Sequence, residues 1–494
     1  MIPSVWMFFV AFLFAGPALA SFRCPAKGGA AWREYRSAHF IVDTDAGRSD
    51  VQPFVHMLEH MHALVLQALV GEQVEIPGHL RVLAFADQTD FHEMGGDSAA
   101  GYYSRGEFGE PTIALPLRAL WSDPEAVAHE LAHHISFFLF PVQPRWFTEG
   151  LAEWVQTVAA RPTDTALSFT GTHIARGTKA MAGAMAGSIP VNLVSWLGYD
   201  ARPLPAKELL SWNGVETASA EARGHLWSWM LYHWLWNERS KAFADYQKRL
   251  ADGGDPDGAW RAVFPELDPS NADAMAKLDG ELDRYRTRGR FAFYKVQAEG
   301  DPHFSEAQIS SSDLHILLLA MRRSWPREPD QQQALRRAVL DEALAEDPGS
   351  PLAQYARAKF AGKVDASALR QAVKSRPADW RGWLLLGQVA PAAEQEPALR
   401  KAVELNPASA AAQNALAWLL VRSDRAKEAL PLASRALDLA PWDANIVDTL
   451  AEVAARLGKC REALQLGKRA VATAGGEQMR KRLADIEKRC PLAR

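Results

Sequence analysis

A fixed spacing of helical segments in the last third of the chain constrains the fold most strongly. Beyond about residue 313 the sequence is rich in Ala, Leu and Arg in helical periodicity, and Pro407 and Pro441 lie 34 residues apart. Alanines recur at the same period: Ala417, Ala429 and Ala436 return as Ala451, Ala463 and Ala470. Small residues that return at fixed positions indicate paired helices that approach closely. The pattern therefore predicts stacked helix pairs.

This periodic segment resembles the tetratricopeptide repeat. The residues that match its first-helix signature and its inter-helix turn are Trp383, Leu386 and Gly387, and Leu457, Gly458 and Lys459. The spacing from Pro377 to Pro407 requires a shortened unit, so we expect two good repeats and two or three degenerate ones. The array should span residues 331–490 and end in a capping helix; an unrelated helical bundle is the alternative. The resemblance implies that the repeats recruit a protein partner or substrate.

Length and charge limit the kind of protein further. A chain of 494 residues exceeds the size of one hydrophobic core, so several domains are expected. It carries 55 basic and 59 acidic residues without a long run of one sign, so we expect no nucleic-acid partner. With 3 cysteines, disulfides do not form its framework.

The first 20 residues have the pattern of a cleaved signal peptide. Residues 5–15 are apolar, and Ala18, Leu19 and Ala20 form a small-x-small cleavage site. We therefore predict a periplasmic or secreted protein. No Lys or Arg precedes Arg23, so an uncleaved membrane anchor is the alternative, and only then would a membrane be a partner.

A helix should open within residues 121–125, with Ser122 or Asp123 as cap and Pro124 in the first turn, and run to about Phe140. It carries His129, Glu130 and His133 as an HExxH motif. Histidines four residues apart share one helix face and can bind one metal ion, whereas Glu130 lies about 100° around the helix, where it can address a metal-bound water. A catalytic zinc site needs three protein ligands and an open position, so a third ligand must follow.

The next predicted helix supplies a candidate in the segment R-W-F-T-E-G-L-A-E, residues 145–153. The two motifs together resemble the gluzincin metallopeptidases, in particular peptidase-MA-like domains, over roughly residues 31–295. The resemblance implies Glu149 as the third zinc ligand and Glu153 as a partner that orients a histidine. We read His134 as a core or supporting histidine.

The predicted fold class is α+β. Residues 21–300 would form a zincin-like peptidase domain with a small mixed sheet and a mostly helical second half, residues 301–330 a linker with the first helices, and the rest an all-α solenoid. Strands are expected at 39–42, 80–86 and 112–116, and helices at 51–69, 87–94 and 222–236, with long loops over 161–220. The resemblance places strand 112–116 at the sheet edge that pairs with an extended substrate.

The predicted activity is zinc-dependent hydrolysis of a peptide or protein, with Zn²⁺ as cofactor and Glu130 as general base. Two alternatives remain: a non-catalytic repeat scaffold with a structural zinc domain, and a zinc amidase that acts on cell-wall material. The presence of Glu130 in the motif argues against the scaffold alternative, because Glu130 is not a ligand and a purely structural zinc site does not need it.

An oxyanion donor is expected on a later helix. Residues 225–235 match a helix of similar domains in the form Y-x-x-S-W-x-L-x-x-x-L, with His225 at the Tyr position. His225 is thus the candidate donor. Tyr232, seven residues on and on the same helical face, is the rival.

A second metal-like motif lies near the start of the chain. His56, Glu59 and His60 spell the inverted zinc motif HxxEH. No second E-G-x-x-E segment is left to complete it, so we read it as an ordinary helix.

The sequence also predicts a disulfide near its end. Cys460 and Cys490 should lie at the same end of two antiparallel helices, where they can bond. Two free or buried thiols are the alternative.

Overall fold

A computed structural model provides the structure of the protein. It describes residues 29–71, 74–95, 101–105, 110–159, 165–170, 173–180, 185–187, 202–214, 217–288, 291, 293–301, 303–361, 366–474 and 476–491. The predicted signal peptide, residues 1–20, lies outside the described residues. Within them, no helix is both long enough and apolar enough to cross a membrane.

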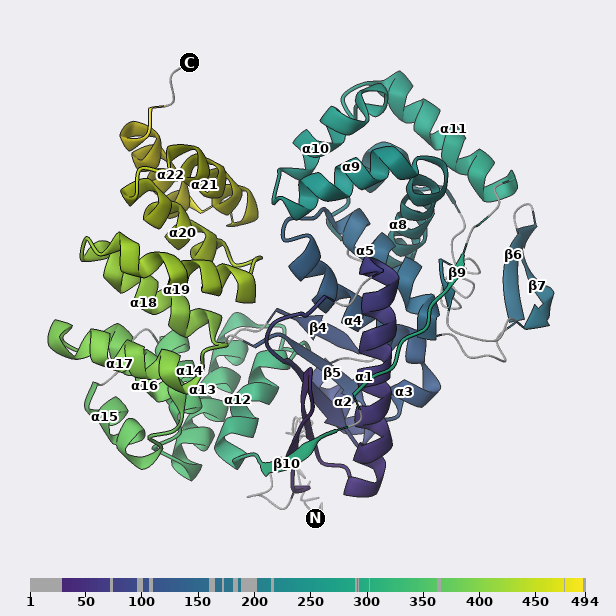
Figure 1. The fold of residues 1–494 in the computed structure, drawn as a ribbon. Coiled ribbons are helices and arrows are strands. Elements are labelled where there is room, and N and C mark those ends of the chain that lie inside the picture. Colours follow the sequence, from purple (N-terminus) through teal and green to yellow (C-terminus); the bar gives the residue numbers. More distant parts are fainter. Residues whose placement is uncertain are drawn as a thin grey trace, which may run out of the picture.

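One six-stranded mixed sheet organises the first domain (Figure 1). Its strands are β1 (Arg33–Arg36), β2 (Phe40–Thr44), β3 (Leu80–Phe85), β4 (Tyr102–Ser104), β5 (Thr112–Pro116) and β10 (Ser305–Gln308), in the order β10-β1-β2-β3-β5-β4. The β2-β3 and β3-β5 pairs are parallel, and the other three pairs are antiparallel. The sheet is therefore mixed, as the sequence predicted.

Helices cover both faces of this sheet. Val82 and Ala84 of β3 join the core formed with α1 (Arg48–Val70) and α4 (Pro124–Leu139). Leu83 and Phe85 point to the other face, where they pack with α2 (Gln88–Gly95) and α12 (Ser311–Met321). This alternation explains why β3 is apolar on both faces from Val82 to Phe85, whereas the buried Arg81 pairs with Asp43 and Glu110.

Three expectations about this domain were wrong. Residues 301–330 do hold a first helix, α12, but they are not a linker, because β10 pairs with β1 and α12 packs on the sheet. β5 is not an edge strand, because it lies between β3 and β4, and β4 forms that edge. The predicted long loops over 161–220 contain a hairpin of β6 (Thr165–Thr170) and β7 (His173–Ala180).

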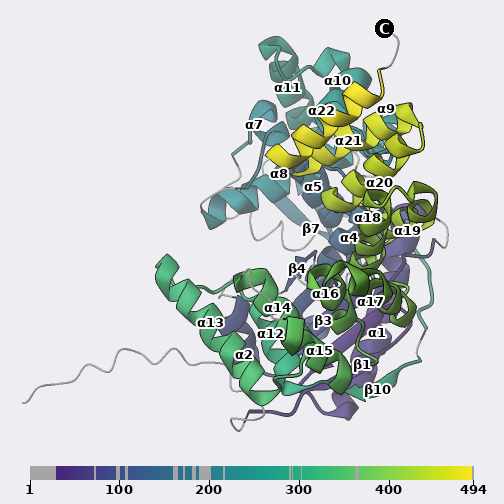
Figure 2. The same cartoon turned by 90° about the vertical axis from the view of Figure 1, so that its left-hand side faces the viewer.

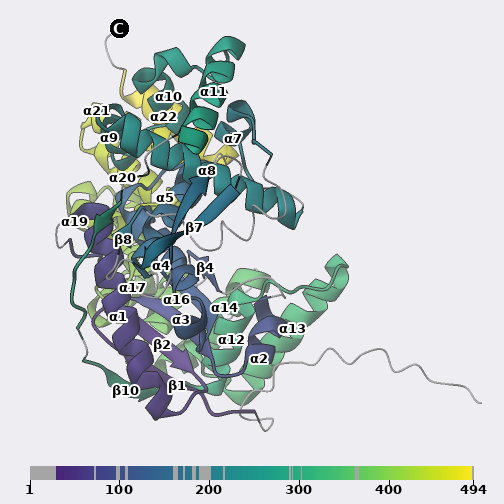
Figure 3. The ribbon, with the colours of Figure 1, turned by 90° about the vertical axis from the view of Figure 1, so that its right-hand side faces the viewer.

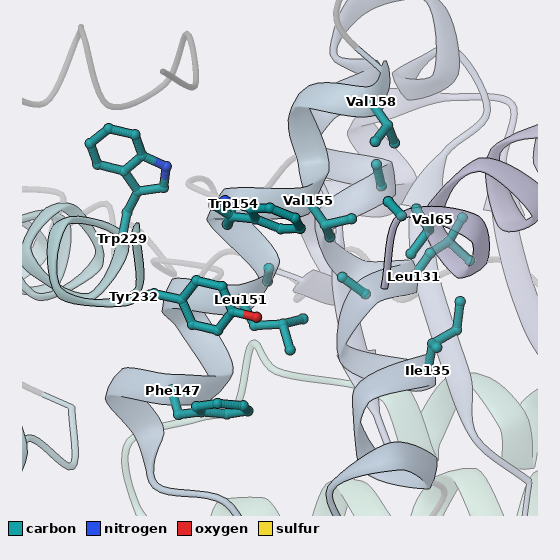
Figure 4. Packing of buried hydrophobic residues seen from close by; sticks show 14 of the residues in the cluster. Val65, Leu131, Ile135, Phe147, Leu151, Trp154, Val155, Val158, Trp229 and Tyr232 are labelled. Carbon is teal, nitrogen blue, oxygen red and sulfur yellow. The ribbon is translucent and has the colours of Figure 1, made fainter. Parts of the chain in front are cut away.

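The helical half of the domain packs around α5 (Arg145–Val155) and α8 (Ala218–Glu238). Figure 4 shows Phe147 and Trp154 of α5 facing Tyr232 of α8. The same half also contains α7 (Ala206–Leu210), α9 (Ser240–Ala251), α10 (Pro256–Val263) and α11 (Ala272–Arg288). In addition, β8 (Met185–Ala186) pairs with β9 (Tyr294–Lys295). In Figure 3, α8 to α11 gather at the end of the molecule opposite β1 and β10.

The remaining helices form a tetratricopeptide-like array (Figure 2). They are α13 (Pro329–Glu346), α14 (Pro351–Ala361), α15 (Ala366–Ser375), α16 (Trp380–Val389), α17 (Ala392–Leu405), α18 (Ala410–Arg422), α19 (Ala426–Leu439), α20 (Ala444–Arg456), α21 (Cys460–Ala474) and α22 (Glu477–Arg489). The pair α18 and α19 and the pair α20 and α21 begin 34 residues apart. The recurrent alanines are fully buried between helices, which confirms the sequence reasoning.

A disulfide closes the end of the array. Cys460, the first residue of α21, is bonded to Cys490, which directly follows α22, with their Cα atoms 5.1 Å apart. The predicted pairing is therefore confirmed. It ties the capping helix to the last repeat.

The array contacts the first domain through one of its inter-repeat turns. Trp442, between α19 and α20, packs edge-on against Phe138 at the end of α4, with ring centroids 4.7 Å apart. Beside this contact, a cavity of about 710 Å³ separates the array from the sheet and is bordered by His134 and Trp380. The array is thus anchored to the helix that carries the HExxH motif.

Candidate metal centre

The HExxH helix begins where the sequence predicted. The Asp123 side chain accepts a hydrogen bond from the amide of Ala126, and Pro124 occupies the first turn of α4. An N-cap and an N-terminal proline both favour a helix start at this point. His129 therefore lies inside regular helix, with Leu131 and Ile135 buried on the core side.

Three side chains from two helices converge on one point. Glu149 Oε2 of α5 lies 3.3 Å from His129 Nε2 and 3.4 Å from His133 Nε2 of α4. The two imidazole rings stand at 89° to each other. His129 and Glu149 are only 8% and 9% exposed, so the site is recessed.

The separations of these atoms fit a tetrahedral metal ion. Zinc binds His nitrogen and carboxylate oxygen at about 2.0–2.2 Å, which places tetrahedral ligand atoms about 3.3–3.6 Å apart. Glu149 Oε2 is buried and receives no well-formed hydrogen bond, although both imidazole nitrogens are near. Such an orphaned carboxylate oxygen is costly unless a cation neutralises it. The residues present therefore fit a zinc site.

Electrostatics favour positive charge at the same point. Burial would raise the pKa of Glu149, but the nearby His225 and His133 hold it well below its usual range. Burial also opposes charge on His129, yet the adjacent Glu149 and the charge of Glu153 raise its pKa to about 9. The Glu149 carboxylate thus stays ionised and attracts a cation, which a metal dication supplies more directly than protonated imidazoles.

Glu130 lies beside this centre but contributes no ligand atom to it. A Cβ atom added to Gly101, the residue before β4, would lie 3.8 Å from Glu130 Cγ. Glu130 therefore borders the site on the side of edge strand β4. This is the side from which an extended chain could pair with the sheet.

A hydrogen-bonded chain supports the histidines from behind. Glu153 Oε1 accepts from His225 Nδ1 at 3.0 Å, as expected for a residue that orients a histidine, but it lies 3.8 Å from His129 Nδ1. The residue that contacts His129 Nδ1 is Gln156, whose Oε1 lies 2.9 Å away. Sequence reasoning missed Gln156, and its only signal is a position one turn after Glu153.

His225 reaches the site, whereas Tyr232 does not. His225 Nδ1 lies 3.6 Å from Glu149 Oε2, and Nε2 lies 3.7 Å from Glu221 Oε1. Burial opposes its charge, but the charge of Glu149 and hydrogen bonds to Glu153 and Glu221 raise the pKa of His225 to about 10. Tyr232 is 2% exposed, and its hydroxyl accepts from Gln247, so of the two candidate donors His225 is the one with contacts at the site.

His134 belongs to the core, as one of the two sequence readings predicted. Its ring contacts Tyr103 and Phe138, and burial lowers its pKa to about 3. None of the candidate metal clusters among the described residues includes it.

The inverted motif does not form a metal site among the described residues. Glu59 is buried, and its carboxylate accepts from the backbone amide and from Nδ1 of His39. His60 is exposed, and no cluster of potential ligands in the described part of the chain includes it or His56. Beyond the centre described above, potential ligands also gather at His129, Glu153 and His225, and at His315, Glu342 and Glu346.

Comparisons with known proteins concern the helical repeats. No protein-family model and no curated protein matches the sequence. Solved structures with local similarity include a thermophilic TPR protein of Thermus thermophilus, at 21% identity over 35% of this chain and 98% of that chain, with a TM-score of 0.28. YrrB, a TPR protein with an unusual peptide-binding site, matches at 19% identity over 35% of this chain and 90% of its own, with a TM-score of 0.25. MamA from Desulfovibrio magneticus RS-1 matches at 16% identity over 32% and 84%, with a TM-score of 0.24. At these values the likeness supports no inference on its own.

Proposed function

We propose that the protein is a zinc metallopeptidase of the gluzincin type, with zinc held by His129, His133 and Glu149. The observation that carries the proposal is the convergence of these three ligand atoms, two of them at 3.3 and 3.4 Å from a buried carboxylate oxygen that has no well-placed hydrogen-bond donor. Three protein ligands leave the fourth tetrahedral position open for a water or a substrate, which is the arrangement of catalytic zinc sites.

The residues around the centre have separate tasks. Bound zinc would lower the pKa of a water molecule and polarise the scissile carbonyl. Glu130, which is not a ligand, would accept the proton of the attacking water and deliver it to the leaving amine. His225 would donate a hydrogen bond to the oxyanion through Nε2, which would turn to it from Glu221 Oε1, 3.7 Å away, while Nδ1 stays bonded to Glu153.

An extended peptide is the substrate class that this surface suits. β4 (Tyr102–Ser104) is an edge strand, and Gly101 at its start lies next to Glu130. A substrate strand that pairs with β4 would bring its backbone carbonyl past the metal centre.

Three variants test the assignment by metal content and by hydrolysis of an unfolded protein. Glu149→Ala should lose most of its zinc, because it removes a ligand, whereas Glu130→Gln should keep zinc and lose turnover. His60→Ala, in the exposed inverted motif, is the matched control and should keep both. Full zinc occupancy in Glu149→Ala, or full activity in Glu130→Gln, would refute the assignment.

A second candidate function is protein binding by the repeat array. The stacked pairs from α16 to α21 form an extended helical surface, a type of surface that repeat proteins use to bind partners. In the peptidase proposal this surface recruits the substrate or a partner; in the alternative it is the whole function and the metal is structural. Turnover that depends on Glu130 separates the two. Export to the periplasm or medium is part of the proposal and is tested by the N-terminal sequence of the mature protein.

A further inference from the structure

Gln156 contacts His129 on the side of the ring away from Glu149, and both the oxygen and the nitrogen of its amide make hydrogen bonds. It is 1% exposed and begins the short 3₁₀ helix η2 (Gln156–Ala159) that follows α5. Its Oε1 lies 2.9 Å from His129 Nδ1, and its Nε2 lies 2.7 Å from Glu153 Oε2. No motif of the sequence pointed to this residue.

The direction of these hydrogen bonds follows from the acceptor at one end. A carboxylate accepts and does not donate, so the amide nitrogen of Gln156 faces Glu153 and the amide oxygen faces His129. The amide oxygen can only accept, so His129 Nδ1 is the protonated nitrogen. When the imidazole is neutral, as a metal ligand must be, the lone pair is then on Nε2, the atom that lies 3.3 Å from Glu149 Oε2.

Glu153 does not perform this task itself. Its Oε1 lies 3.8 Å from His129 Nδ1, beyond hydrogen-bond distance, and accepts instead from His225 Nδ1 at 3.0 Å. The result is one continuous chain, His129 to Gln156 to Glu153 to His225, across α4, η2, α5 and α8. It joins a metal ligand to the candidate oxyanion donor.

We propose that Gln156 is a positioning residue that fixes the ring orientation and the tautomer of His129 for metal binding, and that couples His129 to His225 through Glu153. The inference rests on the proposed zinc site. Partners of this kind behind a ligating histidine typically change metal affinity ten- to hundredfold when they are removed. Here the neutral amide of Gln156 contacts His129, whereas the carboxylate of Glu153 contacts His225.

Two substitutions with opposite expectations test this role. Gln156→Leu removes the acceptor for His129 and should weaken zinc binding by about ten- to hundredfold, measured by competition with a chelator. Gln156→Glu keeps an acceptor for His129 and should bind zinc within about threefold of wild type. The same Glu variant faces the carboxylate of Glu153 and should lower the unfolding temperature of the metal-free protein, because like charges repel.

Thr157→Val is the matched control. Thr157 is also fully buried in η2, and its hydroxyl donates to the carbonyl of Trp154, away from the metal centre. It should alter the unfolding temperature without altering zinc affinity. A purely structural role for Gln156 predicts instead that zinc affinity follows stability in all three variants.

The outcomes separate the two proposals. Wild-type protein that binds zinc, together with a Gln156→Leu variant of unchanged affinity, would overturn the role of Gln156 alone. Wild-type protein that binds no zinc would overturn both proposals. If Gln156→Leu does not fold, Gln156→Glu decides, because loss of zinc from a variant that keeps the acceptor contradicts the role.

Discussion

Replacing Gly150 by alanine should force apart α5 and α8, which carry Glu149 and His225 of the candidate metal centre. Gly150 follows the proposed ligand Glu149 on α5, where that helix crosses α8. A Cβ atom at this position would lie 2.5 Å from the backbone oxygen of Ser228 and 2.8 Å from Tyr232 Cβ. A backbone oxygen cannot rotate away as a flexible side chain can, so the helices themselves must move.

The magnitude follows from two opposing terms. Alanine in a helix interior gains about 1 kcal/mol over glycine. Overpacking costs about 1–3 kcal/mol, and the rigid backbone contact places this site at the upper end. The overpacking term therefore wins, and Gly150→Ala should destabilise the domain by about 2 kcal/mol, or about 4–8 °C in unfolding temperature.

Thermal unfolding of two glycine variants tests this reasoning. Gly280 lies in α11, where an added Cβ meets nothing within 4 Å. Gly280→Ala should therefore raise stability by up to about 1 kcal/mol. Gly150→Ala should lower stability and also weaken zinc binding, because Glu149 and His225 lie on the two displaced helices. A Gly150→Ala protein as stable as Gly280→Ala would refute the argument.

Three other predictions follow from the structure. Replacing Cys490 by serine should lower the free energy of unfolding of the end of the array by about 3–4 kcal/mol. This is the loop-closure value for a cross-link between Cys460 and Cys490, which lie 30 positions apart. An unchanged urea midpoint would contradict this. Trp442→Ala should remove the aromatic contact with Phe138 and increase protease sensitivity between the first domain and the array, and an unchanged cleavage rate would show that other contacts dominate. His225→Phe should keep zinc and lower kcat about a hundredfold or more, whereas unchanged kcat and kcat/KM would assign His225 to packing.

The helical part of the fold could be predicted because its signals are local. Asp123 caps α4 through its own side chain, and Pro124 fits the first turn, so the helix start is encoded in two adjacent residues. The repeats follow in the same way, because Ala417 and Ala451 are small where helix pairs meet in successive units. In these segments, short-range sequence and final packing agree.

The sheet edges could not be predicted from local sequence. β10 (Ser305–Gln308) is exposed and polar, and it joins β1 from about 270 residues away in the chain. β4 has only three residues, too few to show an alternating pattern. Their places depend on pairing with strands that are distant in sequence. The resemblance put β5 at the edge, but β4 lies outside it.

Some residues of the site could be predicted from local sequence, and others depend on how the helices pack. Helical spacing alone brought His129 and His133 to one face, and the E-G-x-x-E segment pointed to Glu149. Gln156 follows no spacing rule, because its contact with His129 depends on where η2 turns away from α5. A contact of Glu153 with a histidine was predicted, but that the histidine is His225 depends on the crossing of α5 and α8.

The central claim is a zinc ion between His129, His133 and Glu149, and anomalous diffraction at the zinc absorption edge tests it most directly. Crystals of the intact protein, grown without added metal, should show one strong anomalous peak within about 2.0–2.2 Å of His129 Nε2, His133 Nε2 and Glu149 Oε2. No peak at that point, or a peak only at His315, Glu342 and Glu346, would contradict the account.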